Sequence, residues 1–238
     1  MNTKISIILI VGLLIWTNFT AAQSEAMDTH KFNIFTMDVS IGIPQGIFSK
    51  NLNKAAFGGF AMQYLKQFQQ DKPLFVGGGM GYHYLTGTTA VVPRINVSGI
   101  EELWDGRTGS SLVKFYGSAR YYFDAGHQKI TPYFQANLGF NWLYTLTSLT
   151  FPDSDESASD FEKGDIAFSY GGGVGAHYAM DYHWHINLSM SLDNGQSAFY
   201  YVRRDEDYVP QYSPVEKMAL KKSLTNYFGI LVGVAYRW

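Results

Sequence analysis

The sequence contains no cysteine, few charged residues and no apolar run long enough for a transmembrane helix. The lack of cysteine excludes a disulfide scaffold, a thiolate metal site, a cysteine nucleophile and a lipid anchor on an N-terminal cysteine. Charged residues make up 16% of the 238 residues, against about 25% in typical soluble domains. The net charge of −2 gives no electrostatic footprint for nucleic acid, so no nucleic-acid partner is expected.

Aromatic residues, by contrast, are frequent. They account for 16% of the chain, and hydrophobic residues as a whole account for 46%, which argues against a disordered protein. A low charged fraction together with many aromatic rings indicates that part of the surface does not face water.

The N-terminus has the three-part pattern of a secretory signal peptide. Residues 1–4 are short and basic, residues 5–16 are predominantly apolar, and Thr20, Ala21 and Ala22 offer small side chains for cleavage. The apolar run falls short of the ~20 residues that span a membrane, so cleavage is favoured over an anchor. Residues 1–22 are therefore predicted to be removed, and residues 23–238 form one exported domain.

Alternation of apolar and polar residues with period two recurs in eight segments, each long enough to cross a bilayer as a tilted strand of ~9–11 residues. Because no later apolar run could span as a helix, a membrane-embedded form must be a closed barrel. A soluble β-sandwich would also alternate, so the period alone does not decide between them. The predicted strands are residues 32–43, 55–68, 74–85, 112–123, 132–147, 166–180, 183–193 and 224–238.

The charged residues inside these segments favour the membrane barrel. A lipid-facing Lys or Arg at mid-depth costs roughly 2–4 kcal/mol. The charges lie instead on the polar face of their strands, except for Lys66, which lies near a strand end where its stem can reach the interface. We expect these charges to form ion pairs that plug the lumen and disfavour passive conduction, because a narrow barrel has room for side chains but hardly for a channel. They are Asp38, Lys114, Arg120, Asp193 and Arg237.

The lengths of the connections and the positions of the aromatic residues also favour the membrane barrel. The connections after the second, fourth and sixth segments are short and the others are longer, which is the arrangement of an outer-membrane barrel with both termini in the periplasm. Aromatic residues on the apolar faces gather toward both ends of the strands, as in the two girdles of such barrels.

These features together resemble a known family. The signal peptide, the eight spans and the terminal run 228–238 resemble the small eight-stranded outer-membrane barrels of the OmpA/OmpX type. Residues 41–48 followed by 58–60 are similar to the opening of such domains in Bacteroidetes-like bacteria. The resemblance implies an all-β, eight-stranded antiparallel up-and-down transmembrane barrel in the outer membrane of a Gram-negative bacterium, in contact with membrane lipid and lipopolysaccharide. It also implies that the barrel-assembly machinery reads Val234, Tyr236 and Trp238.

Three histidines form a weak candidate metal site. His177, His183 and His185 share the lumen face around the third short turn, and three imidazoles could hold zinc or copper. Polar packing in the lumen explains them equally well, since no acidic residue on that face would orient the rings. No metal and no cofactor are therefore predicted. The glycine runs 77–81 and 171–175 lack a following helix, so they are interpreted as relief of crowding rather than phosphate loops.

The long connections carry the candidate recognition residues. An acidic run at 153–165 is interpreted as a solvated loop. The last connection is richer in aromatic residues and arginine, as a recognition surface is, although a loop extending the strands above the membrane would look the same. Its candidate residues are Tyr200, Tyr201, Arg203, Arg204 and Tyr208.

The leading functional hypothesis is a non-enzymatic outer-membrane protein that contributes to envelope structure or to surface interaction through its extracellular loops, with an extracellular partner that the sequence does not identify. One alternative is a small-solute pore or secretion accessory. Another is an enzyme acting on lipid A, but the candidate Ser and His residues share the lumen face and the His-x-Ser order of the barrel deacylases is absent.

Overall fold

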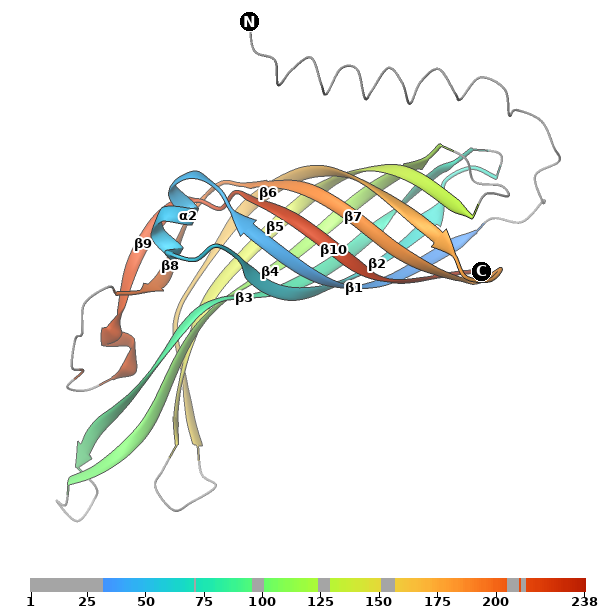
Figure 1. Ribbon diagram of the computed structural model, residues 1–238. Helices are drawn as coiled ribbons and strands as arrows, with labels where there is room; N and C mark the ends of the chain where they lie inside the picture. Colours follow the sequence, from blue (N-terminus) through green and yellow to red (C-terminus); the bar gives the residue numbers. More distant parts are fainter. Residues whose placement is uncertain are drawn as a thin grey trace, which may run out of the picture. The chain divides into compact units, whose positions relative to one another are not determined.

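The computed structural model describes residues 32–70, 72–95, 101–123, 129–150, 157–204, 210 and 213–238. In this part of the chain eight strands close into an antiparallel barrel, with neighbours in the order β1-β10-β7-β6-β5-β4-β3-β2 (Figure 1). The closing pair joins the first strand to the last. The predicted all-β, eight-stranded up-and-down fold is thus confirmed, whereas the predicted signal peptide, residues 1–22, lies outside the described residues.

At the end of the barrel that carries the C-terminus, the strands begin or end within a few residues of the predicted segments. Within the described residues, no helix is long and apolar enough to cross a membrane. The barrel strands are β1 (Asn33–Pro44), β2 (Phe57–Gln67), β3 (Leu74–Ile95), β4 (Glu101–Tyr122), β5 (Ile130–Thr150), β6 (Ser157–Ala179), β7 (Trp184–Gly195) and β10 (Tyr227–Arg237). The remaining elements are α2 (Gly46–Leu52), β8 (Ser197–Arg203), the 3₁₀ helix η1 (Pro214–Lys217) and β9 (Met218–Leu224).

Alternation along the strands separates a polar interior from an apolar exterior. On β1, Thr36, Asp38 and Ser40 are buried, while the intervening Met37 and Val39 are 53% and 68% exposed. Exposing such side chains to water around the whole barrel would forfeit roughly 25 cal/mol for each Å² of apolar surface. The exterior is therefore suited to hydrocarbon.

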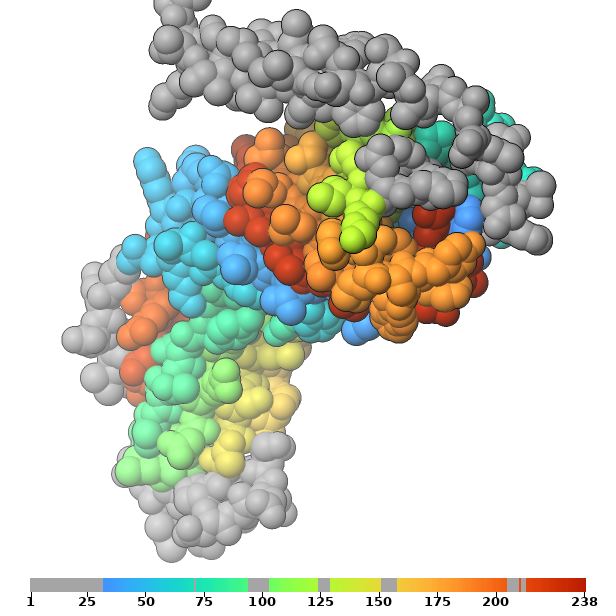
Figure 2. All heavy atoms as spheres, turned by 45° about the vertical axis from the view of Figure 1, so that its right-hand side comes forward, coloured from blue at the N-terminus to red at the C-terminus, as the bar shows by residue number. Residues whose placement is uncertain are grey.

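Four strands are much longer than the barrel requires. β1 and β10 have 12 and 11 residues, about 36–40 Å at ~3.3 Å per residue, which at a tilt of about 40° spans the ~25 Å apolar band. β3, β4, β5 and β6 have 22, 22, 21 and 23 residues. Their excess length projects as a sheet beyond the end of the barrel that carries α2, β8 and β9 (Figures 1 and 2).

This projection corrects the prediction that residues 86–111 and 148–165 are loops. Apart from residues 96–100 and 151–156, which lie outside the described residues, these connections are continuous β-hairpins. The register of β3 against β4 shifts between Tyr84 and Thr86, and that of β5 against β6 shifts between Thr145 and Leu146. Because a one-residue shift exchanges the two faces of a strand, the apolar alternation breaks there, and the predicted strands end too early.

The last long connection is also structured. β8 and β9 pair as a separate two-stranded sheet that continues β7 and β10 past a bend. At the bend, the amide of Thr225 donates to the carbonyl of Gly195 (3.2 Å), and a Cβ on Gly195 would collide with the Thr225 side chain. A glycine here lets the hairpin fold close to the barrel rather than stand upright.

At the opposite end the turn between β6 and β7 is short and held by a carboxylate. Asp181 Oδ1 accepts the backbone N–H groups of His183 (2.8 Å) and Trp184 (2.7 Å). These hydrogen bonds stabilise the charged form and lower the pKa of Asp181 below its ordinary value. The turn is therefore fixed without a longer loop.

Candidate functional site

A buried arginine organises the middle of the lumen. Arg120 is 2% exposed, and its Nη2 donates to Gln63 Oε1 and Gln135 Oε1, both at 2.6 Å. Its guanidinium also lies 4.1 Å from the centre of the Tyr133 ring. Amide oxygens and an aromatic face thus surround this cation. Among the described residues no carboxylate lies within 4 Å of it.

The ion pairs expected among the lumen charges do not include one between Arg120 and Asp38 in the described residues. Asp38 accepts a hydrogen bond from Asn187 Nδ2 (2.7 Å), and Asn187 Oδ1 in turn accepts the hydroxyl of Tyr133 (2.7 Å). Asp38 stands opposite Gly233 of β10, and that glycine leaves room for its carboxylate to reach Asn187 on the next strand. The two charges are thus linked through Tyr133 and Asn187 instead of by direct contact.

A direct ion pair lies at the end of the lumen nearer to α2, β8 and β9. The Lys114 ammonium contacts Asp193 Oδ1, and the two residues are 5% and 4% exposed. The other carboxylate oxygen of Asp193 accepts the hydroxyl of Ser191 (2.9 Å). The Lys114 ammonium also lies 4.9 Å from the centre of the Tyr116 ring. This is the one ion pair within 4 Å that the described residues form.

The two polar clusters face a common cavity in the lumen that is large enough to hold water. Gln63 and His83 line it, and each has one side-chain nitrogen without a hydrogen-bond partner among the described residues, which suits a bound water. Large aromatic side chains fill the rest of the lumen, and glycines next to them leave the space that they occupy. The Tyr133 ring lies against Gly175, where a Cβ would overlap it, as the interpretation of the glycine runs requires.

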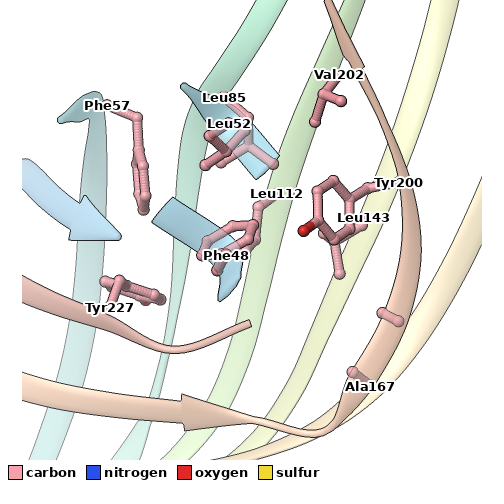
Figure 3. Close-up of a cluster of buried hydrophobic side chains, with 11 residues drawn as sticks. Phe48, Leu52, Phe57, Leu85, Leu112, Leu143, Ala167, Tyr200, Val202 and Tyr227 are labelled. Atoms are coloured by element: carbon pink, nitrogen blue, oxygen red, sulfur yellow. The ribbon is translucent and has the colours of Figure 1, made fainter. Parts of the chain in front are cut away.

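An apolar cluster covers the lumen at the end that bears the projecting sheet (Figure 3). Phe48 and Leu52, one turn apart on α2, are 0% and 4% exposed and meet Tyr200 and Val202 of β8 above the lumen residue Leu112. The Phe48 ring packs edge-on to Tyr200 with a centroid distance of 5.3 Å. We call α2, β8 and β9 the cap. Its apolar side chains close this end of the polar layer.

A second apolar cluster lies at the opposite end of the lumen. Ile34, Phe75 and Tyr122 are buried there, and the Phe75 and Tyr122 rings pack edge-on at 5.2 Å. The Arg237 guanidinium lies 3.9 Å from the centre of the Phe32 ring. The polar layer is thus closed by apolar side chains on both sides.

The sequence that forms this barrel also matches a known protein family. The family model described as "Outer membrane protein beta-barrel domain" matches residues 14–237. The chain belongs to this family. Its members are outer-membrane barrels, so the chain is an outer-membrane β-barrel protein. No curated protein matches the sequence.

Solved structures of outer-membrane proteins are similar to this chain at low sequence identity. A major outer membrane protein from Thermus thermophilus is 12% identical with a TM-score of 0.48, covering 87% of this chain and 99% of that one. Ail, the attachment invasion locus protein of Yersinia pestis, solved with the heparin analogue sucrose octasulfate, is 13% identical with a TM-score of 0.45, covering 88% and 99%. Outer Membrane Protein W of E. coli is 14% identical with a TM-score of 0.36, covering 90% and 100%.

The three histidines of the weak metal candidate do not converge in this barrel. The rings of His177 and His185 lie in the lumen with centroids 5.8 Å apart. His183 is exposed, and its ring stacks on Tyr236 at 5.5 Å. Among the described residues there is no group of three His, Cys, Asp or Glu side chains that could hold a metal ion.

The recognition candidates of the last connection are divided by the fold. Tyr200 is 2% exposed and its hydroxyl accepts Asn51 Nδ2 (2.9 Å) within the cap, so the ring is not available to a partner in this conformation. Arg203 and Arg204 are exposed at the end of β8 and Tyr201 is half-buried. Tyr208 lies outside the described residues.

The expected assembly signal lies at the C-terminal end of β10. Val234 is 41% exposed on the outer face, and Tyr236 stacks on Trp238 with ring centroids 5.6 Å apart. Its reading by the assembly machinery stays a prediction.

One buried pair was missed from the sequence. Ser40 and His83 face each other across the lumen, with Ser40 Oγ 3.0 Å from His83 Nε2. A hydrolytic triad needs an acid on the other ring nitrogen, and among the described residues His83 Nδ1 has no hydrogen-bond partner. The rings of Phe57 and Tyr227 also pack against His83, at 5.4 and 5.7 Å. The pair is polar packing of the lumen, and its signal was the shared lumen parity of Ser40 and His83.

Proposed function

We propose that this protein is a closed, non-enzymatic outer-membrane barrel that presents its projecting sheet and cap to the cell exterior. One observation carries the proposal: the lumen is filled by a polar layer between two apolar clusters, while four strands continue well beyond the barrel. A filled lumen disfavours a solute pore, and a Ser–His pair without an orienting acid disfavours hydrolysis of lipid A.

The orientation proposed places both termini in the periplasm. It is supported by the short connections at the end that carries the C-terminus and by the long, structured connections at the other end. Because the chain lacks cysteine, single-cysteine variants can be labelled without background. On intact cells an impermeant maleimide should label K221C, in the middle of β9, and should label K72C, in the β2–β3 turn, only after permeabilisation.

The outward face of the projecting sheet is the surface we propose for an extracellular partner. Val91, Leu103 and Phe161 are 53%, 63% and 52% exposed there, beyond the aromatic girdle. Exposed apolar side chains outside the bilayer are typical of contact surfaces. Exchanging Val91 and Leu103 for Ser should reduce binding of the protein to the surface of a host cell or a neighbouring cell. The matched control is the cap exchange L220S, which should leave this binding unchanged.

Conduction tests the closed lumen. Purified mature protein in a planar bilayer should give no stable single-channel steps under conditions in which an open porin conducts. Stable steps from the wild-type chain would contradict the proposal and favour the solute-pore alternative. Release of acyl chains from lipopolysaccharide would contradict its non-enzymatic part.

A further inference from the structure

The projecting sheet has two open edges. Its strands lie in the order β3-β4-β5-β6, and β2 and β7, which flank them in the barrel, end before the projection begins (Figure 1). The last pair of β2 with β3 is Gly58 with Tyr84, and the last pair of β6 with β7 is Ser169 with Gly195. Beyond these pairs, β3 and β6 each have a ladder on one side only within the described residues.

The register shift of β3 decides which of its main-chain groups face the open edge. Below the shift, Phe68 N–H donates to the Leu74 carbonyl on the β2 side (2.8 Å). On the β4 side, Tyr122 N–H donates to the Pro73 carbonyl (2.9 Å). Even-numbered residues of β3 therefore bond to β2 and odd-numbered residues to β4, because the direction alternates along an antiparallel strand. The extra residue at the shift, Leu85, reverses this alternation, so beyond it the odd-numbered residues point to the open edge.

The groups that reach this edge belong to Gly87, Thr89, Val91 and Pro93. Thr89 and Val91 are exposed. In the part of the chain that the structure describes, no backbone hydrogen bond joins Gly87, Thr89 or Val91 to an element other than β4. Pro93 has no N–H to leave unpaired, and this side of an edge strand is where proline is tolerated. The edge therefore offers N–H and C=O groups to a further strand.

The two open edges differ in charge. Asp160, Glu162 and Lys163 lie along the open part of β6, and charged side chains on an edge strand oppose its pairing with another chain. β3 carries no charged residue from Thr86 to Pro93, and its threonine and valine residues favour a strand. The β3 edge is thus the one suited to pairing.

We propose that two copies of this chain pair antiparallel through residues 87–95 of β3, which joins their projecting sheets into one. Val91 is the middle residue of this edge and meets its own counterpart on a twofold axis. Thr89 N–H then donates to the Pro93 carbonyl of the other copy, so the missing proline N–H leaves only the Thr89 carbonyl to water. An uncharged strand can meet a copy of itself without like charges in contact, as an isologous contact requires.

A bend in the sheet allows both barrels to lie in one membrane. The register shifts lie on one row of the sheet, at Ser110 and Thr145, and β-bulges bend the strands that carry them. Beyond this row the strands run at an angle to the barrel (Figure 1). A twofold axis along the membrane normal relates antiparallel strands that run across that normal. The contact uses the edge of the sheet and leaves its outward face to the extracellular partner proposed above.

Cross-linking of single-cysteine variants in outer membranes tests the contact, because the chain has no cysteine of its own. A short bismaleimide should link V91C into a covalent dimer. The matched controls are L103C, on the outward face of β4, and S159C, on the open edge of β6. Both positions are exposed but lie away from the twofold axis, so these variants should stay monomeric.

The N–H of Thr89 supplies a second test. In V91C/T89P the lost N–H is one that the ladder with β4 does not use, so the barrel should fold. Dimerisation should weaken roughly 30-fold through the two lost hydrogen bonds. Absence of a linked V91C dimer, equal linkage of all three cysteine variants, linkage of V91C to S159C, or undiminished linkage in V91C/T89P would overturn the proposal. Should V91C/T89P lack the heat-modifiable mobility of a folded barrel, V91K, which sets like charges opposite each other, must fold and sediment as a monomer in detergent in which the wild type sediments as a dimer.

Discussion

The Lys114–Asp193 pair offers the sharpest test of how the lumen is stabilised. Both side chains are about 95% buried and in direct contact, so removing either partner leaves an uncompensated charge in the barrel interior. Breaking a buried pair in this way costs about 3–5 kcal/mol. We use the lower end, about 3 kcal/mol, because the pair borders a cavity with room for water. K114M and D193L should each lower the free energy of unfolding by this amount.

The double variant K114M/D193L should recover most of that loss. Two apolar side chains of similar volume remove both desolvation costs together, and such replacements are often neutral or stabilising. The free energies are measured by urea unfolding in lipid vesicles, followed by the heat-modifiable mobility of the folded barrel. Additive losses in the double variant, near about 6 kcal/mol, would refute the argument that the cost comes from the unpaired charge. So would single variants that lose less than about 1 kcal/mol.

Three further predictions concern the cap, the lumen glycines and the β6–β7 turn. F48A should remove about 3 kcal/mol of packing from the cap and speed proteolysis within the β8–β9 hairpin; unchanged cleavage would show that α2 does not hold it. G175V should cost at least about 2 kcal/mol through overlap with Tyr133, whereas G58V, at a position with open space, should fold normally. Because the pKa of Asp181 in the folded protein lies below its unfolded value of 3.8, its carboxylate stabilises the turn fully above pH 3.8, and this is lost as pH falls through the lower value. The amide proton shift of Trp184 should therefore titrate with a midpoint below 3.8; a midpoint above it, or the same titration in D181N, would exclude the role.

The barrel itself could be predicted because its surroundings impose a strict rule on every residue of a span. Hydrocarbon outside and a crowded polar lumen inside force alternation, so Met37 and Asp38 could be assigned to opposite faces from sequence alone. The rule lapses where neither face meets lipid. Beyond the register shift at Tyr84 the inner face of the projecting hairpins carries buried threonines and serines, such as Thr108 and Thr147, whose hydroxyls pair at 2.8 Å. A polar inner face outside the membrane looks like a loop.

The lumen partners and the cap depended on contacts that a single sequence does not encode locally. Asp38 and Arg120 lie in the same layer, but the choice of Asn187 over Arg120 was decided by the small residue at 233 on the intervening strand. The cap joins Phe48 to Tyr200, far apart in the chain, and Phe48 lies on a helix of only 7 residues. So short a helix has too weak a period to be recognised.

The cap also bears on how the cylinder shuts. Its helix follows the first strand and its hairpin leads into the last, and these are the two strands that meet at the closing junction. The Gln45 amide donates to the Asn226 carbonyl (2.9 Å) directly across that junction, and Asn51 reaches Tyr200 just above it. The cap thus spans the junction between β1 and β10. It can form only after these two strands have paired, and the strands cannot separate at this end until the cap has unfolded.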